Sequence, residues 1–85
     1  MIQSLPRLIA DKGKVLEDAG IERGKGEVEL ILCYLLEVER LQLYLHGEQL
    51  IDDDILRRMD EIITRRVTRE PLQYILGEAW FYGRR

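Results

Sequence analysis

The sequence has a single cysteine, Cys33, and no apolar run approaching the roughly 20 residues that a membrane-spanning helix needs. One cysteine excludes an internal disulfide, and a lone thiol within an apolar run is typical of a reduced chain. Residues 1–4 lack the charged lead and apolar core of a secretory signal peptide. We therefore expect a cytoplasmic protein that does not associate with membranes.

An excess of positive charge is also missing. The chain has 13 Lys and Arg residues and 16 Asp and Glu residues, which gives a net charge of −3. A dedicated nucleic-acid binder normally carries a basic excess on one face, so we expect no direct contact with nucleic acid, and a helix-turn-helix DNA binder is disfavoured. With 46% hydrophobic and 34% charged residues, the 85-residue chain has the composition of one helical domain.

Catalytic and metal-binding residue types are scarce. Ser4 is the only serine and has no neighbouring base, and Cys33 has no nearby His or basic residue to activate its thiol. His46 stands alone without partners at metal-ligand spacing. The acidic run 52–54 is best interpreted as a helix cap, because a metal site there would need ligands from elsewhere. We predict no catalytic residue, no cofactor-binding residue and no metal site.

The first helix is expected to begin at an N-cap, Ser4, with Pro6 in its first turn and Gly13 weakening its middle. Residues 19–26 contain three glycines and are predicted to be a connection with Ile21 turned back into the core. These glycines do not match a phosphate-binding loop, because they lack both the dinucleotide-loop spacing and the Gly-Lys-Ser/Thr ending of a P-loop.

Residues 27–38 are the most apolar segment, which predicts a central helix. Glu29 lies in this segment and requires a partner for its carboxylate. A third helix is expected at 40–46, ended by Gly47, with an inward-facing stripe. That predicted stripe consists of Leu41, Tyr44 and Leu45.

The clearest helical pattern covers residues 53–69. Arg58, Arg65 and Arg69 are predicted to share one flank, which could receive an acidic partner surface. The alternative is an ordinary solvated flank with local pairs such as Asp54 to Arg58, and this alternative is favoured about two to one. Arg66 points closer to the core, so we expect a structural role with its guanidinium on Glu29 or Glu70.

The spacing of apolar residues changes within residues 70–83, from a helical pattern to one typical of a strand. Pro71 is expected to open a short helix that Gly77 closes in a left-handed conformation. The aromatic run 80–82 then predicts the first strand of a hairpin, with no partner strand following it in the sequence. We therefore expect a piece that ends where a second domain begins. Candidate interdomain contacts are Gln73, Tyr74, Trp80 and Phe81.

The same stretch closely resembles the segment that links the two domains of release-factor glutamine methyltransferases, the HemK/PrmC family. The matching residues are Glu70-Pro71-Leu72-Gln73-Tyr74-Ile75-Leu76-Gly77 and Phe81-Tyr82-Gly83. Arg65-Arg66 resembles the family's arginine pair, and residues 25–32 resemble its basic-x-acidic-small-Glu-x-Leu-Leu helix start. Lys25, Glu27 and Val28 stand there in place of the usual Arg, Asp and Ala.

The resemblance implies an N-terminal domain of an enzyme that transfers a methyl group from S-adenosylmethionine to the glutamine of the Gly-Gly-Gln loop in class 1 release factors. It implies that residues 1–77 are an all-α bundle of four or five helices that recognises the release factor. Residues 78–85 would start the interdomain β-hairpin towards the protein's own C-terminal catalytic domain, which has a Rossmann-like fold. The family's catalytic Asn-Pro-Pro-Tyr motif belongs to that second domain. The only prolines here are Pro6 and Pro71, so no catalytic or cofactor role is carried over.

The alternative is a stand-alone helical protein-interaction module with no enzymatic parent. An acyl-carrier-like bundle has a similar size and acidity, but it needs a serine at a helix start to carry the prosthetic group. Ser4 lies at the beginning of the chain without that context. A methyltransferase loop and Asn-Pro-Pro-Tyr in the downstream reading frame would distinguish the enzyme from the stand-alone module.

Overall fold

The computed structural model describes residues 4–83, with side chains up to Gly77, and confirms the all-α class. Five helices and no strand occur in that part of the chain. None of these helices has the length and apolar character required to cross a membrane. The helices are α1 (Leu5–Asp18), α2 (Gly24–Leu36), α3 (Arg40–Leu50), α4 (Asp53–Val67) and α5 (Leu72–Gly83).

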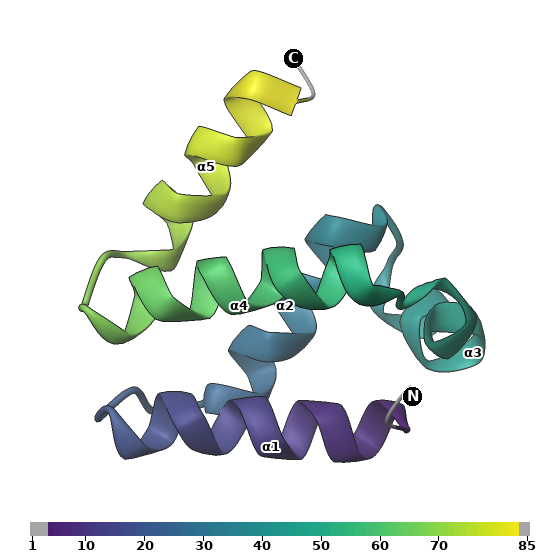
Figure 1. Ribbon diagram of the computed structural model, residues 1–85, viewed down its shortest axis with the longest axis horizontal. Coiled ribbons are helices and arrows are strands. Elements are labelled where there is room, and N and C mark those ends of the chain that lie inside the picture. Colours follow the sequence, from purple (N-terminus) through teal and green to yellow (C-terminus); the bar gives the residue numbers. More distant parts are fainter. Residues whose placement is uncertain (1–3, 84–85) are drawn as a thin grey trace.

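Helix α2 is the centre of the bundle, as its apolar sequence predicted. Figure 1 shows α1 and α4 running across the molecule with α2 crossing between them, and α2 contacts α1, α3 and α4. Val28, Ile31 and Leu32 of α2 are completely buried. The core therefore forms around α2, and its neighbours contribute one apolar face each.

Both predicted N-caps are confirmed. The Ser4 hydroxyl accepts from the Arg7 N–H at 3.4 Å, and the Asp52 carboxylate accepts from the Ile55 N–H at 2.9 Å. Asp53 and Asp54 occupy the first turn of α4, where the helix dipole favours negative charge. The acidic run 52–54 thus starts a helix.

The connection between α1 and α2 is shorter than predicted. Helix α2 begins at Gly24, so the second half of the expected linker forms its first turn. Ile21 is buried as expected. Gly24 is also buried, because α2 begins in contact with α1 and leaves no space for a side chain there.

The predicted inward stripe of α3 is wrong. Leu41 and Leu45 are 70% and 62% exposed, and Tyr44 is 49% exposed. Leu43 and Gly47 face the core instead, and a methyl group on Gly47 would press into the Leu43 side chain. Gly47 is therefore a packing position within α3, which continues to Leu50.

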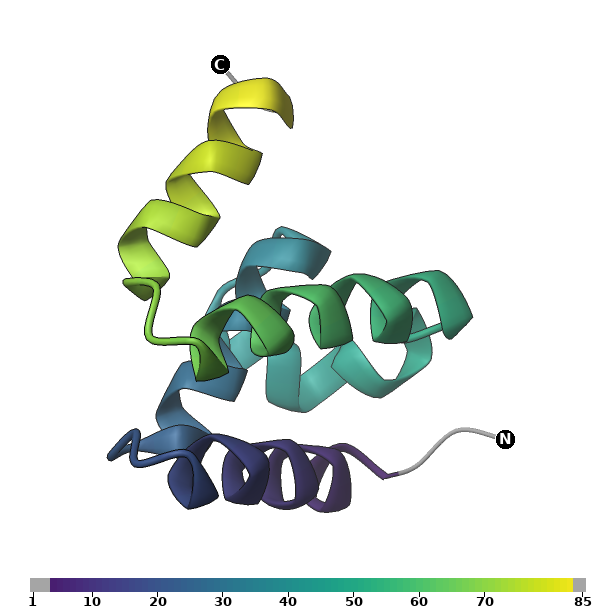
Figure 2. The same cartoon turned by 60° about the vertical axis from the view of Figure 1, so that its left-hand side comes forward.

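The predicted strand at 80–82 is also wrong, because α5 continues as a helix through Gly77 to Gly83. Gly77 does not adopt the left-handed conformation. In the described part of the chain there is no strand to pair with these residues, so the helix satisfies their backbone groups internally. The buried Ile75 anchors the first turns of α5, and the rest of the helix leans away from the bundle (Figure 2).

Candidate interaction surfaces

The three flank arginines come from two different local structures. Arg58 and Arg65 project from α4, but α4 ends at Val67, and Arg69 follows it in a left-handed conformation with φ 77°. The Arg69 guanidinium lies against Gly20 in the α1–α2 connection, where a methyl group would be 2.5 Å from Nη2. The expectation of one continuous helical flank is therefore wrong for Arg69.

The other two flank arginines have carboxylate partners within the chain. Arg58 Nε lies 3.7 Å from Asp54, which confirms the predicted local pair. Arg65 donates from Nε and Nη2 to the two Glu70 oxygens at 2.7 and 3.2 Å. This forked arrangement holds the pKa of the Glu70 carboxyl below its ordinary value, because the hydrogen bonds stabilise the charged form.

Arg66 joins three parts of the bundle. Its Nε and Nη2 donate to Glu27 of α2 at 2.8 and 3.1 Å, and its Nη1 donates to the Glu70 carbonyl oxygen at 3.0 Å. The prediction that Arg66 pairs with Glu29 is wrong. Glu70, the other predicted partner, binds Arg66 through its backbone carbonyl oxygen. Donation of hydrogen bonds to the Glu27 carboxylate raises the Arg66 pKa above its ordinary value. The structural role is thus to fix the α4–α5 turn against α2.

Glu29 has a different pair of partners, both on α3. The Tyr44 hydroxyl donates to one carboxylate oxygen, and Arg40 Nε lies 3.3 Å from the other. Donation to Glu29 is the main cause that raises the Tyr44 pKa. Residues two apart on a helix point about 200° from each other, so Glu27 reaches α4 and Glu29 reaches α3. The sequence thus shows that the two carboxylates point to different sides of α2, and the packing of α4 against the Glu27 side selects Glu27 as the Arg66 partner.

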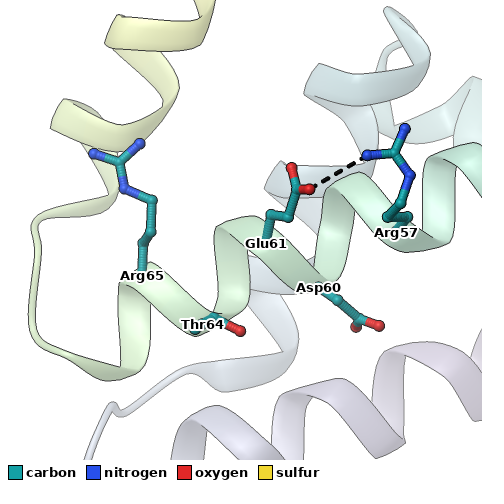
Figure 3. A pocket seen from close by; sticks show the side chains of 5 residues that line it. All are labelled: Arg57, Asp60, Glu61, Thr64 and Arg65. Carbon is teal, nitrogen blue, oxygen red and sulfur yellow. Dashed lines mark hydrogen bonds and ion pairs between the residues drawn. The ribbon is translucent and has the colours of Figure 1, made fainter.

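A shallow hollow of about 570 Å³ lies along the exposed side of α4. Figure 3 shows its lining residues, Arg57, Asp60, Glu61, Thr64 and Arg65, with an ion pair of 3.3 Å between Arg57 and Glu61. Two arginines and two carboxylates give it mixed charge. The hollow is suited to polar contacts with a protein surface.

The remaining polar and nucleophilic candidates are separate from each other. Cys33 is half-buried against the core, and burial raises the pKa of its thiol, which disfavours the nucleophilic thiolate. His46 is exposed on α3. No group of three or more His, Cys, Asp or Glu side chains within the described range is arranged to hold a metal ion.

The two predicted interdomain residues with described side chains are both on the surface of α5. Gln73 is exposed, and Tyr74 is 58% exposed. Trp80 and Phe81 lie beyond the described side chains. Both described side chains are therefore accessible to a partner, and their contact with a second domain stays a prediction.

The fold and these surfaces define a small all-helical domain with exposed charged and apolar faces suited to protein contacts. The chain belongs to the PrmC N-terminal domain family, whose family model matches residues 8–77. The recognition of this family from residues 70–83 and the arginine pair is thus confirmed.

Curated relatives carry the name "Release factor glutamine methyltransferase". The protein from Nitratidesulfovibrio vulgaris is 32% identical over 95% of this chain and 28% of its own length. The relatives from Neisseria gonorrhoeae and Koribacter versatilis are 43% and 39% identical over 72% and 84% of this chain, and over 22% and 25% of their own lengths. The chain therefore spans about a quarter of these relatives. Comparison with solved structures found no significant match.

Proposed function

We propose that this chain is the substrate-recognition domain of a methyltransferase that acts on class 1 peptide chain release factors. The observation that supports this proposal is the similarity over residues 8–77 to the N-terminal domain of enzymes with that name. A large protein substrate can bind far from the reacting atom, and this binding energy orients the reacting group. The domain contributes binding and orientation to the reaction.

The chemistry belongs to a C-terminal catalytic domain in the parent enzyme. That domain binds S-adenosylmethionine and transfers its methyl group to the side-chain nitrogen of the glutamine in the Gly-Gly-Gln loop. The helical recognition domain comprises residues 1–77, and residues 78–85 belong to the link to the catalytic domain. The 85-residue chain binds no cofactor and has no transfer activity alone. Incubation with S-adenosylmethionine and a release factor, followed by mass spectrometry, should show no added methyl group.

The exposed face of α5 is proposed to contact the catalytic domain. Gln73 and Tyr74 lie on the surface of α5, directly after the turn that Arg66 fixes against α2. An exposed tyrosine at a domain boundary is suited to a partly apolar interface. Trp80 and Phe81 are assigned to the same interface from their place in the sequence.

The basic flank is proposed to contact an acidic region of the release factor. Arg58 and Arg65 pair with carboxylates that are themselves partly exposed, and such pairs exchange easily for intermolecular ones. Replacement of Arg65 and Arg69 by Glu should weaken release-factor binding severalfold at low salt. Lys14→Glu is the control, because it reverses an exposed charge on α1, away from this flank. Unchanged affinity in the double variant would remove this flank from the interface.

Titration of the isotope-labelled chain with a class 1 release factor tests the proposed recognition. We expect localised changes in amide chemical shift that diminish between low and moderate salt, because charged contacts are screened. A spectrum that stays unchanged at the highest release-factor concentration would contradict autonomous recognition by this domain.

A further inference from the structure

The outer side of α3 presents an apolar surface to solvent. Leu41 and Leu45 are one turn apart and are the most exposed large apolar side chains within the described residues. Tyr44 lies beside them at the i+3 position and is held by Glu29 of α2. These three residues, which we call the α3 face, are displayed by a helix whose opposite side is anchored in the core by Leu43.

The segment that contains the α3 face is rich in negative charge. Residues 37–54 contain six carboxylates and one arginine, so this segment has a net charge of −5, whereas the whole chain has −3 and the remainder therefore +2. All six acidic residues are exposed. They precede α3, occupy its last turns or follow it: Glu37, Glu39, Glu48, Asp52, Asp53 and Asp54.

We propose that the α3 face binds a cationic segment of the release factor in which apolar side chains lie among lysines and arginines. This inference rests on the proposed function. The exposed leucines supply apolar area, and the net negative charge of residues 37–54 favours a partner of opposite charge. Nucleic acids and anionic lipid surfaces carry the same sign as this region and are repelled by it.

The position of α3 in the fold favours a separate partner over a domain that follows α5. Helix α4 has 15 residues, which corresponds to a length of about 22 Å, and α3 adjoins its first residue whereas α5 follows its last. Figures 1 and 2 show α3 at one end of α4 and α5 leaving from the other end, away from the bundle. The α3 face is therefore remote from the point where a catalytic domain would be attached.

Affinity measurements with single substitutions test this surface. Leu45→Gln should weaken binding of a class 1 release factor about tenfold, because one leucine loses its apolar contact, and Leu41→Gln should act similarly. Val15→Gln on α1 is the matched control, since Val15 is also exposed, and its affinity should stay within about twofold of wild type. Amide spectra of the free variants establish that the fold is retained.

The outcomes separate this inference from the proposed function. Shifts of the α3 amides on addition of release factor, together with weaker binding of Leu45→Gln, support both. Binding with shifts confined to other helices, or undiminished by the α3 substitutions, would overturn the α3 assignment and leave release-factor recognition intact. Absence of any binding would overturn both. Dilution of the chain alone should leave the α3 amides unchanged, since a concentration dependence would assign the face to a second copy.

Discussion

Gly24 at the start of α2 lies directly against Gly13 in the middle of α1. A methyl group on Gly24 would be 2.2 Å from the Gly13 carbonyl oxygen, and one on Gly13 would be 2.9 Å from the backbone nitrogen of Lys25. The two helices thus approach each other so closely that neither glycine position has room for a methyl group. Gly13, which the sequence presents as a weak point of a helix, is a packing position.

We expect Gly24→Ala to lower the free energy of unfolding by about 1–3 kcal/mol or more, because the clash involves backbone that has little freedom to move. Gly26→Ala is the control two residues away, since a methyl group there meets nothing within 4 Å. This control should stabilise α2 by about 0.5–1 kcal/mol through helix propensity. Urea denaturation measures both changes in unfolding free energy. Equal changes in the two variants would contradict the close contact between α1 and α2.

Arg66→Lys should lower the free energy of unfolding by about 1–2 kcal/mol, although the charge is kept. The side chains of Arg66 and Glu27 are 19% and 18% exposed, and lysine cannot reproduce the forked hydrogen bonds. Arg57→Lys is the control, because its ion pairs lie on the surface and contribute little. If Arg66→Lys lowers the free energy of unfolding no more than the control does, the α4–α5 turn is not held by this arginine.

Stability should depend on pH through Glu70. Its pKa is lower in the folded chain than the unfolded value of about 4.3, because Arg65 hydrogen-bonds the carboxylate. The Arg65–Glu70 contribution is therefore fully present above the unfolded pKa and is lost as the pH falls through the folded pKa. Carbon-detected titration of the Glu70 carboxyl should show the low value, and Arg65→Gln should return it towards 4.3.

The pH dependence of the unfolding free energy gives a second test of the Arg65–Glu70 ion pair. The difference in unfolding free energy between wild type and Glu70→Gln should be constant near neutral pH and shrink in the acidic range. A difference that grows as the pH falls, or a Glu70 carboxyl that titrates above its ordinary value in the wild type, would contradict the assignment of the hydrogen bonds.

Gly77→Ala should stabilise α5 by about 0.5–1 kcal/mol, because Gly77 has helical backbone angles and open space at its Cβ position. Amide exchange along α5 should slow accordingly. If Gly77 closed the helix in a left-handed conformation, as the sequence predicts, alanine would be strained and exchange would accelerate.

Features determined by residues close in sequence were the ones that sequence analysis predicted well. The N-caps Ser4 and Asp52, the central apolar helix and the pair Asp54 to Arg58 all depend on spacings of a few residues. The family assignment likewise depends on a continuous segment, residues 70–83. Local pattern is sufficient in these cases because the physical interactions are themselves local.

The errors concern choices that only tertiary packing decides. Leu41 and Leu45 match an apolar stripe as well as Leu43 does, but the contact of α3 with the core selects Leu43. The partner of Arg66 depends on which face of α2 meets α4, and Glu27 and Glu29 are equally near in sequence. The aromatic run 80–82 fits a strand by propensity, yet a strand requires a neighbour, which the described chain does not supply.

Recognition of the protein substrate by this domain is tested most directly in a chimera in which this chain replaces the corresponding segment of the Nitratidesulfovibrio vulgaris relative. Methyl transfer is measured with an intact class 1 release factor and with a short peptide that carries the Gly-Gly-Gln sequence. We predict that the chimera methylates both, and that deletion of the segment raises KM for the release factor at least tenfold while the peptide is methylated at the chimera's rate. An unchanged KM for the release factor after deletion would contradict substrate recognition by this domain.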